Sequence, residues 1–343
     1  MALTMKFRHW AIFLCFLAFG LRAEDNLVTV VTRGDEAACR RLLASGGTEA
    51  LNSVAGVSPL YAAALSGHAG CIRLLLKAGS SLETQVVRAG PYERLRLDGG
   101  RTALHGACSA GHEACALLLL QAGARADSRD DAGRSPMMLA AMAGSVPLVR
   151  QLLDHHGAEL GGKDDSGVNA LQLAVLSGRH EVLLELQGRG MDLTVKTADG
   201  RGLMHLAAAS GQWSLVQHLI GRGLDLSDRD DAGRLPLHHA AASGRAVILR
   251  HLVERDQGVN SVDKAGWTPL HHAVAAGTDH QVWVELLRLG ANEQALTAQG
   301  ESLYSLACRS GREEHWRQWD LLRQAQPQSD EARRKIIYGG VSK

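Results

Sequence analysis

The chain has 343 residues, of which 45% are hydrophobic and 21% charged, enough apolar material for one large or two ordinary folded domains. Its 37 Lys and Arg residues nearly balance its 36 Asp and Glu residues, so the formal net charge is only +1. This composition excludes a disordered chain and argues against a protein that binds nucleic acid through an overall excess of positive charge.

The first 23 residues have the order of a secretory signal peptide. Lys6 and Arg8 precede an apolar run at 10–21, and small residues follow it before the first acids. This run is shorter than the roughly 20 apolar residues that span a bilayer. We therefore expect cleavage after Ala23, or alternatively after Gly20, and a mature chain that is periplasmic or secreted and not inserted in a membrane. The alternative is an uncleaved segment that anchors the chain at its N-terminus.

Glycines recur along the rest of the chain at intervals of 33 or 34 residues, from Gly34 to Gly311, with one interval of 44 between Gly67 and Gly111. Each follows an Ala-rich segment and precedes a Leu-rich segment that ends at another glycine. Because glycine readily adopts the positive φ found at helix ends, each unit is predicted to hold two short helices and a loop. Thr268 and Pro269 have the residue types that begin a helix.

The Ala-rich segments carry a recognisable motif. It reads TPLHHAVAAG at 268–277, LPLHHAAASG at 235–244, TALHGACSAG at 102–111 and SPLYAAALSG at 58–67. These segments resemble ankyrin repeats. The resemblance covers residues 24–325 in about nine units and implies an all-α solenoid, in which helix pairs stack and hairpin-like loops project from one edge. Residues 326–343 are predicted to be a polar C-terminal tail.

The resemblance implies a non-catalytic scaffold that binds a partner protein through its concave loop-and-helix face. No nucleophile elbow and no phosphate-binding loop occurs in the sequence. We therefore expect no enzymatic activity, no cofactor, no metal, no nucleic-acid partner and a monomeric state.

Contact positions in ankyrin repeats include the residue before the motif and the two residues before the inter-helix glycine. Mapped onto this chain, they give the candidate partner-binding residues Arg101, Arg134, Arg201, Arg234, Trp267, Met142 and Leu176. Arg and Trp are over-represented among binding hot spots. The alternative for the arginines is ion pairing between turns with Asp98, Asp131, Asp199 and Asp231, and the apolar pair could be covered by neighbouring side chains.

The 44-residue interval contains extra residues at 84–97, which we expect to lengthen one projecting loop. Tyr92 lies there among several arginines, so the loop could add specificity to the binding face. The alternative is an insertion without function, because surface loops tolerate added length at little cost.

An alternative function is metal binding or redox sensing by His105, Cys108, His112 and Cys115, whose types and spacing are those of a zinc site. The repeat pattern offers a simpler explanation, in which His105 is the motif histidine, which hydrogen-bonds loop backbone in this family, and Cys115 takes an apolar core position. His239 and His272 stand where other units have Leu or Gly, which predicts packing. The five cysteines beyond residue 23 are expected to be buried free thiols, with Cys108–Cys115 the one pair to test.

Overall fold

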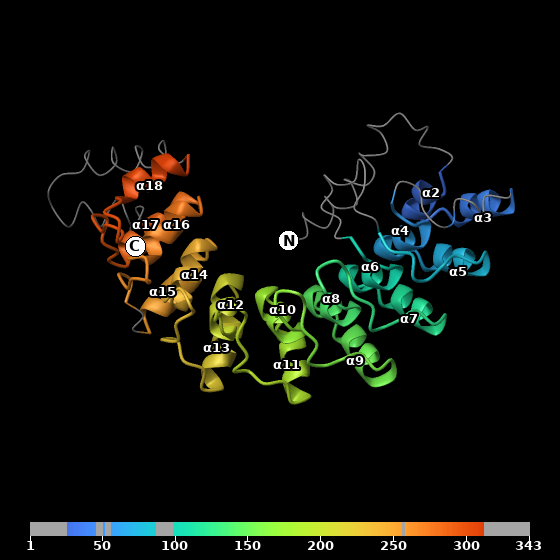
Figure 1. Ribbon diagram of the computed structural model, residues 1–343, viewed down its shortest axis with the longest axis horizontal. Coiled ribbons are helices and arrows are strands. Elements are labelled where there is room, and N and C mark those ends of the chain that lie inside the picture. Colours follow the sequence, from blue (N-terminus) through green and yellow to red (C-terminus); the bar gives the residue numbers. More distant parts are fainter. Residues whose placement is uncertain (1–25, 46–50, 52–55, 87–98, 256–257, 312–343) are drawn as a thin grey trace, which may run out of the picture. The chain divides into compact units, whose positions relative to one another are not determined.

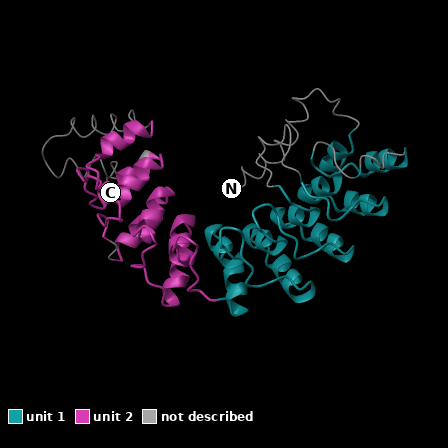
Figure 2. Cartoon of the chain, in the orientation of Figure 1, with its two compact units in different colours: residues 1–191 teal, residues 192–343 magenta. Residues whose placement is uncertain are grey.

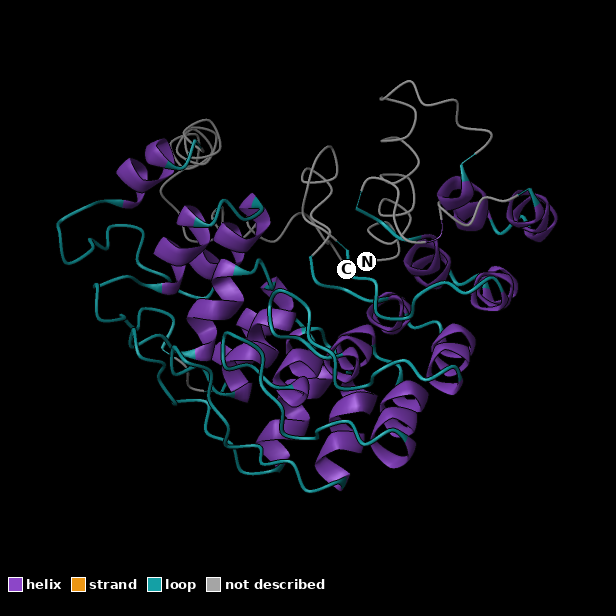
Figure 3. Cartoon of the chain, turned by 45° about the vertical axis from the view of Figure 1, so that its right-hand side comes forward, coloured by secondary structure: helices purple, strands orange, loops and turns teal. Residues whose placement is uncertain are grey.

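A computed structural model of the chain describes residues 26–45, 51, 56–86, 99–255 and 258–311. The predicted signal peptide, the C-terminal tail and Tyr92 lie outside these residues. The described part contains seventeen α-helices joined by loops and no strand, apart from the isolated bridges Lys163–Asn169 and Leu296–Ser302 in two loops (Figure 3). The prediction of an all-α repeat fold is confirmed.

The chain divides into two compact units, residues 1–191 and 192–343 (Figure 2). Unit 1 contains five helix pairs: α2 (Leu27–Arg33) with α3 (Glu36–Ala44), α4 (Pro59–Ser66) with α5 (Ala69–Lys77), α6 (Ala103–Ala110) with α7 (Glu113–Gln121), α8 (Pro136–Ala143) with α9 (Val146–His155), and α10 (Ala170–Leu176) with α11 (His180–Gly188). Unit 2 contains α12 (Leu203–Ser210) with α13 (Trp213–Gly221), α14 (Pro236–Ala242) with α15 (Ala246–Val253), α16 (Pro269–Ala275) with α17 (His280–Arg288), and α18 (Leu303–Arg309).

Within each unit, first helices pack on first helices and second helices pack on second helices. In unit 1 each first helix contacts the first helix of the next pair, in the order α2, α4, α6, α8 and α10. The second helices form another row beside them (Figure 1). In unit 2, α12, α14, α16 and α18 form such a row, and α15 packs on α17. A pair therefore buries its apolar sides against neighbouring pairs, which is the source of stability in a repeat protein.

The helix ends follow from the local sequence. The Thr268 hydroxyl accepts the His271 N–H at 3.4 Å, and Pro269 occupies the first helical turn of α16, as predicted. Between α6 and α7, Gly111 has φ of 75°, a left-handed conformation that costs glycine little and other residues more. The two short helices of a pair are therefore held at a tight turn.

First helices are built to be buried on several sides. Every residue of α8 from Pro136 to Ala141 is buried, whereas α9 buries one stripe, Leu148, Val149 and Leu152. Small alanines let the first helices approach closely, and the leucines of the second helices cover them. None of the helices in the described part of the chain has the length and apolar character needed to cross a membrane.

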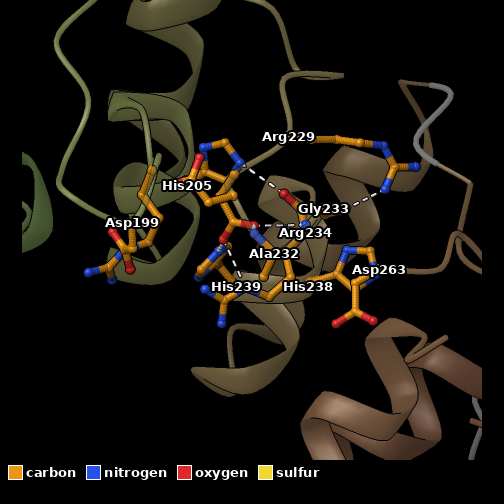
Figure 4. Close-up of polar contacts among 12 residues, drawn as sticks. Asp199, His205, Arg229, Ala232, Gly233, Arg234, His238, His239 and Asp263 are labelled. Carbon is orange, nitrogen blue, oxygen red and sulfur yellow. Dashed lines mark hydrogen bonds and ion pairs between the residues drawn. The ribbon is translucent and has the colours of Figure 1, made fainter. Parts of the chain in front are cut away.

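In several repeats the motif histidine links its own helix to the next loop. In unit 1, Nδ1 of His105 accepts the Thr102 N–H at 3.2 Å, so Nε2 carries the proton and donates to the Arg134 carbonyl at 3.1 Å. In unit 2, His205 Nε2 donates in the same way to the Arg234 carbonyl at 3.1 Å (Figure 4). The prediction that these histidines bond loop backbone is confirmed.

Candidate functional site

The loops that precede the first helices form a row of hairpins in each unit. A backbone hydrogen bond closes each hairpin, for example from the Asp230 N–H to the Arg234 carbonyl at 3.1 Å. A second kind of bond joins consecutive hairpins, for example from the Lys264 N–H to the Ala232 carbonyl at 2.9 Å in unit 2. The backbone of each hairpin row is therefore fixed by its own hydrogen bonds.

A buried carboxylate lies at the base of one unit 1 hairpin. Asp130 accepts Arg101 Nε at 3.2 Å and lies 3.0 Å from Nη2 of Arg134, and its side chain is fully buried. Burial alone would raise the pKa of Asp130, but hydrogen bonds from the Arg134 N–H and guanidinium outweigh it and lower that pKa. Asp130 therefore stays ionised between two arginines of neighbouring hairpins.

Unit 2 repeats this carboxylate with a different set of donors. Asp230 accepts Nε of Arg234 and Nε2 of His239, each at 2.8 Å. One repeat later, Asp263 accepts Nε2 of His272 at 2.8 Å and the Trp267 N–H at 2.9 Å. Each carboxylate thus ties a hairpin to the first helix of its own repeat.

The two imidazoles are neutral donors. Burial lowers the pKa of His239 to about 4, and the hydrogen bond to Asp230 offsets only part of this effect. Burial also lowers the pKa of His272, against the opposing effect of Asp263. At neutral pH these pairs are therefore hydrogen bonds between a neutral ring and a carboxylate, not ion pairs.

The prediction that His239 and His272 simply pack in place of leucine was incomplete. The ring of His239 does pack edge-on against His205, with centroids 5.3 Å apart, and His272 lies 5.1 Å from the ring of Trp267. Both rings also donate to a carboxylate nine residues earlier in the chain. This Asp-to-His spacing, present twice in the sequence, was the available signal.

The four candidate arginines are less accessible than a partner-binding role would require. Arg101 is only 5% exposed, so it does not offer a contact surface to a partner. Arg134, Arg201 and Arg234 are half-buried, and each lies in an ion pair. The alternative of ion pairing is therefore what the structure shows for all four.

The acids in these pairs correct the sequence-based expectation. Arg201 pairs with Asp199, as expected, at 2.8 Å. Arg101 and Arg134 pair with Asp130, and Arg234 pairs with Asp230, where the sequence had suggested Asp98, Asp131 and Asp231. Asp98 lies outside the described residues. Asp131 and Asp231 are exposed, and each lies over a glycine of the preceding hairpin, because the hairpin turn points neighbouring side chains in different directions.

The apolar candidates are more accessible. Leu176, the last residue of α10, is 43% exposed, whereas Met142 on α8 is half-buried. Trp267 is also half-buried, with its ring beside His272. Partner contact by these residues stays a prediction.

The insertion emerges from a hairpin. The Val86 N–H donates to the Arg101 carbonyl and the Gly100 N–H donates to the Val86 carbonyl, both at 2.9 Å. The residues that flank positions 87–98 are thus paired with each other, and a lengthened loop between them stays a prediction. Residues 87–98, including Tyr92, lie outside the described residues.

The four residues of the possible zinc site do not form a ligand set. Both ring nitrogens of His105 are used by backbone groups. Burial raises the pKa of Cys108 to about 12 and that of Cys115 to about 11, so both are thiols. Cys308, in contrast, is exposed, which corrects the expectation that all five cysteines are buried. Across the described ranges, no three His, Cys, Asp or Glu side chains lie where they could hold one metal ion.

Comparison with known protein families gives a match along most of the chain. The model of the family described as ankyrin repeats (3 copies) matches residues 27–130, 104–197 and 204–297. A comparison with curated proteins gave no match. Ankyrin repeats generally mediate protein–protein interaction, and proteins built from them are typically scaffolds, not enzymes. The helix pairs, the hairpins and the family match together place this chain in the ankyrin-repeat family.

Proposed function

We propose that this chain is a non-catalytic scaffold that binds a partner protein through its hairpin face. Each of the two units has such a face, which consists of its hairpins and the exposed sides of its first helices. Two observations support the proposal. Large apolar side chains are exposed on this face, and the hairpins that carry some of them are held by their own hydrogen bonds.

The described residues include six large hydrophobic side chains that are exposed. Four of them lie on the hairpin face, namely Leu176, Val262, Leu296 and Tyr304, and two lie on second helices, namely Leu184 and Val247. Val262 and Leu296 are 50% and 58% exposed and occupy the hairpin position that Arg229 holds one repeat before Val262. About half of each apolar side chain is thus in contact with solvent, which favours a role in binding.

The hairpins are also ordered before any partner arrives. The carboxylates of Asp130, Asp230 and Asp263 are satisfied by donors from the same unit, and backbone bonds join consecutive hairpins. Binding then loses little conformational entropy, because the loops are already held in one arrangement. Affinity would come from the exposed apolar side chains and from Trp267.

We further propose that the protein acts outside the cytoplasm, as a monomer, with no cofactor and no nucleic-acid partner. The order of charge, apolar run and small residues before Glu24 supports export. The mass of the N-terminal peptide of the mature protein, isolated from the exported fraction, tests this. A peptide that begins within residues 21–24 is expected, and an N-terminus that retains Lys6 and Arg8 would contradict cleavage.

The binding face is tested by affinity capture of the tagged full-length protein from its native compartment, with two tryptophan variants. Trp267→Ala alters the hairpin face, and Trp213→Ala alters α13, where the ring stacks on His251 at 4.4 Å. We expect a protein recovered with the wild type to be lost with Trp267→Ala and kept with Trp213→Ala, both variants remaining helical by circular dichroism. Loss with Trp213→Ala alone would place binding on the second helices instead.

A further inference from the structure

Four positively charged side chains are exposed on the first two second helices of unit 1. Arg40 and Arg41 lie on α3, and Arg73 and Lys77 lie on α5. Among the described residues, none of these four side chains forms an ion pair or a hydrogen bond. The four residues, which we call the basic patch, therefore carry charge that no contact within the described structure neutralises.

Arginines on later second helices are instead paired with acids of the next repeat. In unit 1, Arg150 on α9 lies 2.6 Å from a carboxylate oxygen of Glu185 on α11. In unit 2, Arg250 on α15 lies 2.8 Å from a carboxylate oxygen of Glu285 on α17. These pairs join neighbouring repeats, so their charges are used within the stack. The basic patch has no such partner, and its charge remains available to an external group.

The acids of α3 lie at the beginning of that helix. Asp35 is the N-cap of α3, and the Glu36 carboxylate lies against Gly70, in the first turn of α5. The basic patch occupies the later turns of the same two helices. Arg73 and Lys77 are four residues apart and therefore lie on one side of α5. Positive charge is thus separated from the acids along the helices.

The basic patch forms one surface across two repeats. Arg73 follows Arg40 by 33 residues, which places the two at equivalent positions on helices that pack against each other. Packed helices lie about 8–10 Å apart, so the charges are close enough to act on one object. The next second helix, α7, contains no Lys or Arg, so the patch ends at α5.

We propose that the basic patch binds the anionic headgroups of a lipid membrane, without insertion of the helices. Each Lys or Arg near an anionic lipid surface strengthens binding about fivefold, so four act together by on the order of several hundredfold. The patch lies on second helices, which are not part of the hairpin face (Figure 1). The hairpins therefore stay available to a partner protein while the second helices face the lipid.

A lipid surface suits these side chains better than an acidic protein does. Arg134 of the hairpin row is held by the buried Asp130 carboxylate, whereas nothing fixes the side chains of the basic patch. They act as separate point charges, and a membrane presents phosphates without demanding a fixed arrangement. Export would also carry the first repeat, which begins at Leu27, past a membrane soon after the apolar run at 10–21. Only this last step rests on the proposed export.

The test is sedimentation of the protein, purified from its native compartment, with two sets of lipid vesicles. One set contains phosphatidylcholine alone, and the other also contains about 30 mol% phosphatidylglycerol. We expect about tenfold or more stronger binding to the anionic vesicles, and we expect this difference to disappear when NaCl is raised from about 50 mM to about 500 mM. Equal binding to the two sets, or a difference that salt does not reduce, would contradict the proposal.

Two lysine variants with the same change of charge locate the binding surface. Lys77→Glu alters the basic patch, and Lys163→Glu alters an exposed lysine in the hairpin row of unit 1. Lys77→Glu should weaken binding to anionic vesicles about tenfold, and Lys163→Glu by less than about threefold. Arg73→Lys should bind like the wild type, because a lipid surface needs the charge but not the planar guanidinium. Equal losses for the two lysine variants would show that only the total charge matters, against the proposal.

Labelled polyglutamate, titrated in parallel, separates a membrane from an acidic protein as the ligand. Binding of polyglutamate but not of anionic vesicles, with loss of the polymer in Lys77→Glu, would assign the basic patch to an acidic protein and overturn the proposal. Partner binding on the hairpin face has its own test in Trp267→Ala. A failure of the basic patch therefore leaves the proposed function standing.

Discussion

Nε2 of His239 lies 2.8 Å from Oδ2 of Asp230, and the same atoms of His272 and Asp263 repeat this distance one repeat later. In each case the carboxylate belongs to a hairpin and the imidazole to the helix that follows it. The pair therefore ties the hairpin to the first helix of its own repeat, and unit 2 does so in two consecutive repeats.

Asp230→Asn should destabilise the protein, whereas Asp231→Asn should not. Asn at 230 keeps the shape but loses the charge that pairs with Arg234, and it weakens the acceptor for the neutral His239 ring, so we expect the free energy of unfolding to fall by about 1–3 kcal/mol. The neighbouring Asp231 is exposed, and its replacement should change that free energy by less than about 0.5 kcal/mol. Urea unfolding followed by circular dichroism measures both, and equal effects would show that the buried carboxylate has no special role.

Replacing a buried arginine should cost more stability than replacing an exposed one. Arg101→Ala leaves Asp130 buried with one of its two arginines, and we expect a loss of about 2–3 kcal/mol in the free energy of unfolding. The side chains of Arg201 and Asp199 are 33% and 48% exposed, so Arg201→Ala should cost at most about 1 kcal/mol. The same denaturation measurement applies, and a larger loss for Arg201→Ala would contradict the structure.

Stability should fall as the pH drops from about 6.5 to about 4. Burial lowers the pKa of His105 and His238 in the folded protein from 6.5 to about 4. As the pH falls below 6.5, the unfolded chain therefore takes up protons first, and the folded state loses on the order of 3 kcal/mol for each such histidine by pH 4. Above pH 6.5 this contribution is fully present. Unfolding free energies measured in urea at several pH values test the slope.

His105→Gln is the matched variant for this pH dependence. Gln172 already occupies the motif position in another repeat, where it accepts the Asn169 N–H at 2.9 Å. Gln at 105 should keep that cap without titrating, so the variant should show a slope smaller by about one proton between pH 6 and pH 4.5. An unchanged slope would mean that His105 is not kept neutral by burial.

The sequence predicted the repeat architecture because local chemistry determines it. Thr268 and Pro269 have the residue types that begin a helix, as they do in α16, and Gly111 has the type that ends one, as it does in α6. The resemblance to ankyrin repeats implied a bond from His105 to loop backbone, and the structure shows it to the Arg134 carbonyl. These features needed no knowledge of tertiary contacts.

The details of the site could not be predicted in the same way. Asp130 and Asp131 are adjacent in sequence, and only the geometry of the hairpin turn decides that the first is buried between arginines and the second exposed. A single sequence does not show which way a side chain points in a turn, or which distant residues it meets there.

The central claim is that a partner protein is held by the hairpin face, and two exposed leucines of one repeat test it most directly. Leu176 ends the first helix α10 and is 43% exposed, and Leu184 lies on the second helix α11 and is 38% exposed. Calorimetric titration with the captured partner should show a Kd raised about tenfold or more by Leu176→Glu and unchanged by Leu184→Glu. An unchanged Kd for Leu176→Glu together with a raised Kd for Leu184→Glu would place the partner on the second helices and contradict this account.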